Sequence, residues 1–236
     1  MQARLTRIAC VALLVVAVVL QGRMASLVLG ECLTDSDPPA HFTTGVMAHE
    51  YLKSALGSNP LAFAESFYVR FPKVALGQWP PVYYGIQAVW YFLFPTSPAS
   101  AKVLSAVIAA TMAALLFLRL RRWYGLLPAS AAVALFLSLP EIQTAAWEVM
   151  SDLLTGLLVL LAILSLSTFL EEPGRPRNAW WFALWSSLAL LTKGSAMALV
   201  PFALLAPWFA WRPRCLGNIW YWASGVACGL LSQYQM

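Results

Sequence analysis

The chain has 236 residues, of which 61% are hydrophobic and only 11% charged, and its mean hydropathy is +0.71. Soluble globular domains carry about 25% charged residues, so this composition excludes a water-soluble domain and predicts an all-α protein embedded in lipid. The net charge of +5 does not indicate a nucleic-acid partner, because the basic residues fall into separate clusters between apolar runs.

The first residues resemble a secretory signal peptide. Arg4 and Arg7 precede an apolar run at residues 8–29, but no clear small-residue cleavage site follows it. We therefore expect an uncleaved signal-anchor helix, with a cleaved peptide as the open alternative. The chain contains 4 cysteines and no Cys-x-x-Cys pair, so we expect them to pack as small apolar side chains rather than to form disulfides.

Apolar runs that approach the length of a membrane span recur along the chain. A spanning helix needs about 20 apolar residues. The runs lie at residues 8–29, 81–94, 98–118, 126–147, 153–170, 179–192, 195–211 and 216–232. The basic clusters beside them are Arg4/Arg7, Arg119/Arg121/Arg122, Arg175/Arg177 and Arg212/Arg214. Cytoplasmic loops are enriched in Lys and Arg. All four clusters lie on the cytoplasmic side only if one of the runs between residues 30 and 118 does not cross the membrane.

That run is Pro80–Phe94, which is short, bounded by prolines and rich in the Trp and Tyr that favour an interface. We expect a helix at the outer surface there. The chain is then a single module over residues 1–236, with a signal-anchor helix at 8–29, an outer loop with juxtamembrane helices at 30–97, and about six further spans within 98–232. This predicts about seven transmembrane helices, a multi-pass protein of the plasma (inner) membrane, and a cytoplasmic N-terminus.

The same topology gathers most carboxylates on the outer side, together with Lys193. These acids are Glu31, Asp35, Asp37, Glu50, Glu65, Glu141, Glu148 and Asp152. In the outer loop, Asp35, Asp37 and His41 could act as a base, bind a metal or orient a substrate. The alternative is a solvated loop with a helix start, because Asp37 is followed by Pro38 and Pro39.

Asp152 precedes a strongly apolar run, and ionisable groups near hydrocarbon are functional candidates. Glu148 lies four residues earlier, so the two acids would share a face if the helix were continuous. The alternative for Asp152 is that it only opens a helix, where a carboxylate suits the helix dipole.

Cations and aromatic residues supply further candidates. Lys193, in Leu-Thr-Lys-Gly, either extends to the interface or binds a lipid-linked phosphate. The stretch Tyr68–Tyr84 suits a polyprenyl-phosphate head group or a sugar, and equally plain anchoring at the interface. Its candidate residues are Arg70, Lys73, Gln78, Trp79 and Tyr83. No nucleotide-binding or metalloprotease motif is present. The sequence identifies no certain cofactor, and a divalent metal bound by the outer Asp and His residues is left open.

In order, these segments resemble the membrane glycosyltransferases of the GT-C class, in the branch of protein O-mannosyltransferases and lipid A aminoarabinose transferases. The likeness covers nearly the whole chain and includes Leu120–Gly125, a proline followed by an Asp-Leu-Leu helix start, and Leu-Thr-Lys-Gly. The related enzymes continue with further spans and often an outer domain. The resemblance therefore implies an N-terminal catalytic module, with truncation left open.

The resemblance implies transfer of a sugar from a polyprenyl-phosphate donor to a lipid, glycan or protein acceptor at the outer face of the membrane. Asp37 stands where the family has its first-loop aspartate, a base or orienting group. Asp152 matches the second outer aspartate, and Lys193 matches a lysine near the donor phosphate. Membrane lipids are the other expected partners.

The chain departs from the family pattern at two places. The family has Glu after its first aspartate, where this chain has Pro38, so Asp35 or His41 could replace that Glu. A cation or histidine often precedes the first proline of the interfacial helix, where this chain has Gln78-Trp79, so Lys73 or Arg70 could substitute. The alternatives to an enzyme are half of a transporter or flippase, although no internal repeat is evident, and a non-catalytic membrane scaffold.

Overall fold

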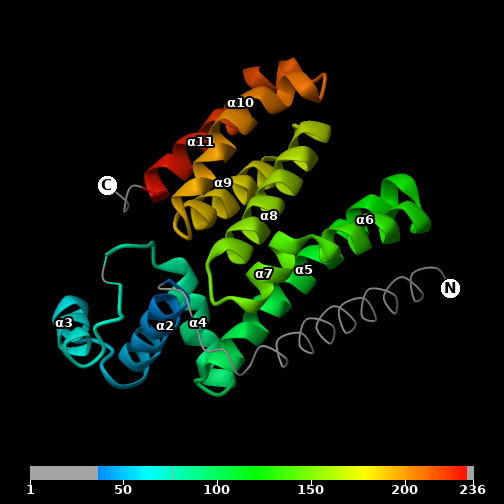
Figure 1. Cartoon of the computed structure of the whole chain (residues 1–236). Coiled ribbons are helices and arrows are strands. Elements are labelled where there is room, and N and C mark those ends of the chain that lie inside the picture. Colours follow the sequence, from blue (N-terminus) through cyan, green and yellow to red (C-terminus); the bar gives the residue numbers. More distant parts are fainter. Residues whose placement is uncertain (1–36, 76, 233–236) are drawn as a thin grey trace. The chain divides into compact units, whose positions relative to one another are not determined.

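The computed structural model describes residues 37–75 and 77–232, and these form helices joined by turns (Figure 1). The predicted signal-anchor helix at 8–29, Arg4, Arg7 and Asp35 lie outside the described residues. The α-helices are α2 (Asp37–Ser54), α3 (Pro60–Arg70), α4 (Val82–Leu93), α5 (Pro98–Tyr124), α6 (Leu126–Ser138), α7 (Pro140–Trp147), α8 (Asp152–Glu171), α9 (Pro176–Leu190), α10 (Leu199–Phe209) and α11 (Ile219–Ser232). Two 3₁₀ helices, η1 (Gly194–Ala198) and η2 (Pro213–Gly217), flank α10. The all-α prediction is confirmed for this part of the chain.

Two of these helices, α5 with 27 residues and α8 with 20, are long and apolar enough to cross a membrane. The pair α6 and α7 would make a third span, although it is bent by 59°. The helix α4 has 12 residues and is therefore about 18 Å long, too short to cross a hydrocarbon core of roughly 30 Å. The described helices thus confirm the membrane-type composition, and the count of seven spans stays a prediction.

The break between α6 and α7 has a local cause. The sequence predicts one apolar run over residues 126–147, but Pro140 lies inside it. Proline has no N–H to continue the helical ladder and disfavours the helical conformation of the preceding residue. Accordingly Leu139 is extended, with φ −62° and ψ 128°, and Pro140 begins α7 at its first turn.

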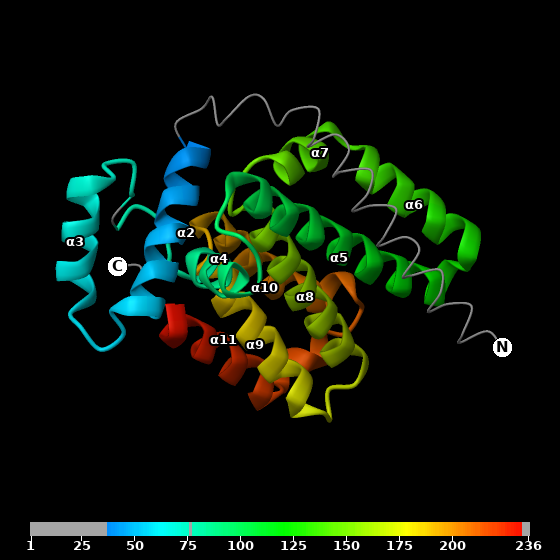
Figure 2. The same cartoon turned by 90° about the horizontal axis from the view of Figure 1, so that it is seen from below.

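The chain divides into two compact units. The first contains the described residues up to Gln78 together with Tyr83–Leu153, and the second contains Trp79–Val82 together with the described residues from Leu154 onward. In the first unit α5 lies beside α6 (Figure 2), and Ala113, Phe117, Ala129 and Val133 form the buried cluster between them. Small alanines on both helices permit this close approach.

The helix α4 of the first unit packs on the start of α5. The Trp90 indole N–H of α4 donates to the Ser100 carbonyl (3.1 Å) and to its Oγ (2.9 Å). A second buried cluster contains Tyr91, Ala101 and Val149. These contacts hold α4 against the segment that connects α7 to α8.

In the second unit α9 and α11 lie side by side. The Asn218 Nδ2 donates to the Pro173 carbonyl at 2.9 Å, and the Cys215 thiol contacts the Leu170 carbonyl. The turn after α8 and the turn before α11 therefore lie together at one end of this unit. The same end carries Arg175, Arg177, Arg212 and Arg214.

Candidate active site

The helix α2 begins at Asp37, so the predicted helix start at Asp37-Pro38-Pro39 is confirmed. The side chain of Asp37 is exposed at this helix start. His41 follows one turn later, so the two side chains share a face of α2. In contrast to Asp37, His41 is only 2% exposed. An exposed carboxylate thus stands one turn from a buried imidazole.

Two tyrosines of α4 surround the His41 ring. Its Nδ1 lies 2.8 Å from the Tyr84 hydroxyl, and its ring stacks with Tyr84 at a centroid distance of 5.8 Å. The Tyr83 ring meets it edge-on at 5.7 Å. Tyr83 is 1% exposed and Tyr84 5%. The imidazole and both phenols therefore form one buried aromatic group.

Both candidate aspartates act electrostatically on these phenols. Burial raises the pKa of Tyr83 above its ordinary value; Tyr91, Tyr84 and the charge of Asp152 raise it further, while the nearby Ser105 hydroxyl lowers it. Burial also raises the pKa of Tyr84, and the charge of Asp37 adds to this effect. Desolvation disfavours a phenolate, and a neighbouring carboxylate does so too. Both phenols therefore stay neutral at physiological pH; the charge of Asp152 acts on Tyr83 and that of Asp37 on Tyr84.

Asp152 is the first residue of α8 and is exposed. Glu148 does not lie on the same helix, because α7 ends at Trp147 and Glu148 is extended, with φ −93° and ψ 150°. Glu148 and Asp152 therefore do not share a helix face, because no continuous helix joins them. Instead the Glu148 carbonyl accepts a hydrogen bond from the Ser105 hydroxyl at 3.1 Å. This bond fixes the segment that leads to Asp152.

Lys193 and Trp79 belong to the second unit. Val82 is the last residue of the Trp-Pro-Pro-Val segment, and its N–H donates to the Leu191 carbonyl at 3.1 Å. Lys193 is half-buried and caps the start of η1. The structure therefore brings the aromatic proline segment next to the turn that carries Lys193.

The other predicted cations lie elsewhere in the first unit. Arg70 ends α3 and lines a cavity of about 490 Å³ between α2 and α3, together with Glu50 and several phenylalanines. Lys73 is exposed in the turn after α3, and Gln78 is exposed as well. The lining of the α2–α3 cavity contains neither candidate aspartate, so the geometry does not group Arg70 with them.

Lys102 and Gln87 are among the buried polar residues of the described chain that the sequence does not single out. Lys102 on α5 is 7% exposed and lies one turn before Ser105. Gln87 on α4 is fully buried, and its amide atoms have no hydrogen-bond partner among residues 37–75 and 77–232. Lys102 could have been found from the sequence, because a lysine inside an apolar run is a candidate functional residue. Within the described residues, no group of three or more His, Cys, Asp or Glu side chains could hold a metal ion.

Residues 78–233 match the family described as dolichyl-phosphate-mannose-protein mannosyltransferase. The chain belongs to this family. No curated protein and no solved structure matches the chain. The match includes Trp79, Tyr83, Asp152 and Lys193, whereas Asp37 precedes it.

Membership in the mannosyltransferase family confirms the predicted likeness to the GT-C class. It supports a membrane glycosyltransferase that takes its sugar from a polyprenyl-phosphate donor.

Proposed function

We propose that this protein transfers a hexosyl or pentosyl group from a polyprenyl-phosphate donor to an acceptor hydroxyl or amine at the outer face of the plasma (inner) membrane. The observation that carries the proposal is the exposed Asp37 carboxylate, which lies one helical turn from the buried His41, Tyr83 and Tyr84 group. Family membership supplies the donor class, and the arrangement of these side chains supplies the candidate chemistry.

In the proposed reaction the acceptor heteroatom attacks the anomeric carbon of the sugar. The bond from that carbon to the phosphate oxygen breaks, and its electron pair leaves with the polyprenyl phosphate. Asp37 takes the proton of the acceptor. A positioned general base contributes roughly 10²–10⁴-fold to such a step, and the exposure of Asp37 lets an acceptor reach it.

Lys193 is the proposed cation for the departing phosphate. A lysine is a compact point charge that suits phosphate oxygens, and Lys193 lies at a turn held to the Trp79–Val82 segment by the Val82–Leu191 hydrogen bond. Trp79 and the neighbouring prolines offer an apolar surface for the lipid.

The buried aromatic group has a positioning role in this scheme. His41 cannot be the solvent-accessible base, because it is 2% exposed and bonded to Tyr84. Its contact instead fixes α2 on α4 and so fixes Asp37. Asp152 is proposed to orient the sugar or the acceptor at the same group, and its place near Tyr83 supports this role.

The test uses membranes that contain the full-length protein, with radiolabelled mannosyl and aminoarabinosyl polyprenyl phosphates supplied in separate reactions. We expect label from one donor to appear in acceptor material only when the protein is present. Equal transfer in membranes without the protein would overturn the proposal. Passage of intact donor across the bilayer without transfer would instead favour a flippase.

A further inference from the structure

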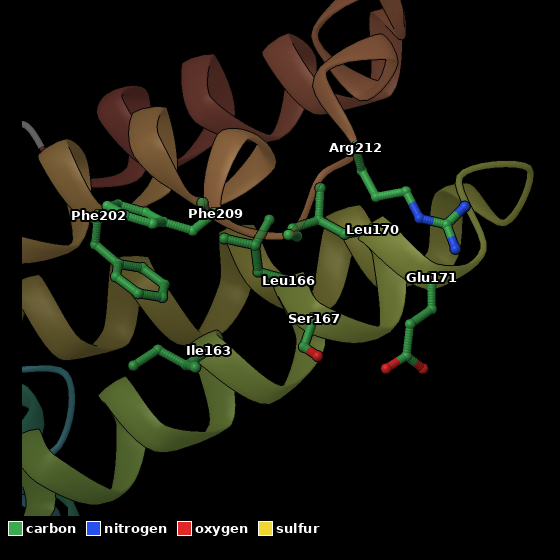
Figure 3. Close-up of a pocket in the computed structure, with 10 residues that line it drawn as sticks. Ile163, Leu166, Ser167, Leu170, Glu171, Phe202, Phe209 and Arg212 are labelled. Carbon is green, nitrogen blue, oxygen red and sulfur yellow. The ribbon is translucent and has the colours of Figure 1, made fainter.

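A second cavity system lies in the second unit, at the end where its arginines gather. The helices α8 and α10 line a groove of about 550 Å³, whose walls include Leu166, Leu170, Phe202 and Phe209 (Figure 3). Glu171 also lines this groove, and in Figure 3 its carboxylate extends away from the Arg212 guanidinium. Most of the groove surface is hydrocarbon.

A second cavity of about 570 Å³ lies beside this groove; we call it the polar cavity because its lining is more polar than that of the groove. It is lined by residues from the turns at the two ends of η2, including Trp211, Arg214 and Asn218. Arg212 lines both the groove and the polar cavity. Within the described part of the chain, the guanidinium groups of Arg212 and Arg214 have no ion pair. The apolar groove thus leads to two arginines that form no ion pair with a described residue.

The turn that presents Arg212 has an unusual residue. The Trp211 N–H donates to the Trp208 carbonyl (3.1 Å) and the Arg212 N–H to the Pro207 carbonyl (2.8 Å), which is the Schellman ending of a helix. That ending favours glycine at the left-handed position, but here Trp211 has φ 55°. Trp211 is also 90% exposed, and tryptophan is enriched at membrane–water interfaces.

This end lies away from the proposed donor site. The turn that contains Pro173 precedes α9, and Pro173 lines the same cavity as Arg212 and Arg214 and is bonded to Asn218, whereas Lys193 follows α9. With 15 residues in α9, the two ends are about 22 Å apart along the helix. Arginine-rich ends of spanning helices face the cytoplasm, so the groove would open into the leaflet where anionic lipids lie close to the arginines.

We propose that this groove binds an anionic phospholipid of the cytoplasmic leaflet. One acyl chain lies between α8 and α10, and the lipid phosphate contacts Arg212 and Arg214 in the polar cavity. Guanidinium groups recognise phosphate through paired hydrogen bonds, and Trp211 sits at the level of the head groups. The charge of the two arginines selects an anionic lipid over a zwitterionic one.

The experiment measures lipids that stay bound to the full-length protein. The purified protein is exchanged into mixed vesicles of phosphatidylglycerol and phosphatidylcholine, extracted again, and examined by native mass spectrometry. We expect preferential retention of phosphatidylglycerol. Replacing both arginines, Arg212→Gln with Arg214→Gln, should weaken this retention by about 25-fold, since each arginine near an anionic surface contributes about fivefold.

Matched variants separate the site from general charge. Arg175 lines neither cavity and is exposed in a pair with Glu172 (2.9 Å), so Arg175→Gln should retain phosphatidylglycerol as the wild type does. Phe209 is 79% exposed, and Phe209→Ser should reduce retention without disturbing the fold. Unchanged retention in the double-arginine variant, or equal retention of phosphatidylcholine, would overturn the proposal. Full competition by glycerol phosphate alone would also overturn it, because that result indicates a site for a soluble anion.

Discussion

The packing of α2 on α4 depends on a single glycine. Gly45 lies in the middle of α2, and a Cβ atom placed on it would stand 2.2 Å from the Gln87 Oε1, 2.7 Å from its Cδ and 3.1 Å from its Cβ. Gln87 is fully buried, so its side chain has little room to move. We therefore expect Gly45→Ala to force the two helices apart.

The magnitude follows from two opposing effects. Alanine favours a helix over glycine by about 1 kcal/mol, while overpacking a buried site costs about 1–3 kcal/mol. The net destabilisation is thus up to about 2 kcal/mol, or a fall of up to roughly 6 °C in apparent melting temperature for a protein of this size. Loss of monodisperse elution after heating in detergent measures it.

A matched control and a rescue variant isolate the clash. Gly85 lies on α4 with nothing within 4 Å of a built Cβ, so Gly85→Ala should raise the melting temperature slightly. Adding Gln87→Ala to Gly45→Ala removes the two shortest contacts and should recover most of the loss. If Gly45→Ala is as stable as Gly85→Ala, the reasoning about the α2–α4 contact is wrong.

Three further changes test the buried group and the helix break. His41→Phe removes the 2.8 Å hydrogen bond to Tyr84 and should lower the free energy of unfolding by about 1–3 kcal/mol. If His41→Phe lowers it by the same amount in a Tyr84→Phe variant, loss of this hydrogen bond is not the cause. Burial raises the pKa of Tyr83, so the unfolded state ionises first and stability should fall as the pH rises above about 10. Tyr83→Phe should make this alkaline loss smaller, and an identical pH profile would count against the burial argument. Pro140→Ala should reduce the 59° bend between α6 and α7, measured by the distance between spin labels on the two helices; an unchanged distance would show that Pro140 does not cause the bend.

Helix starts could be predicted from the sequence because their signals are local. Asp37 followed by two prolines indicates the beginning of a helix, as does Asp152 before an apolar run, and both helices begin at these residues. The short helix after Pro80-Pro81 was predicted for the same reason. Pro140 is also a local signal for the break, whereas the apolar composition of residues 126–147 predicts one continuous run.

The contacts that assemble the candidate site could not be predicted in the same way. His41 and Tyr84 are 43 residues apart, and no periodicity pairs a residue of α2 with a residue of α4. The burial of Lys102 depends equally on how α5 packs in its unit. Local patterns therefore indicated which residues could carry chemistry, while tertiary packing decided which of them meet.

The central claim is that Asp37 takes the acceptor proton during sugar transfer. The most direct measurement compares transfer of label from the polyprenyl-phosphate donor by the wild type, Asp37→Asn and Glu50→Gln, with donor binding measured in parallel. Glu50 is a second acid of α2 that lines the α2–α3 cavity and serves as the matched control. We predict that Asp37→Asn binds the donor but loses transfer by at least about 100-fold, while Glu50→Gln keeps it. Transfer by Asp37→Asn at the wild-type rate would contradict the account.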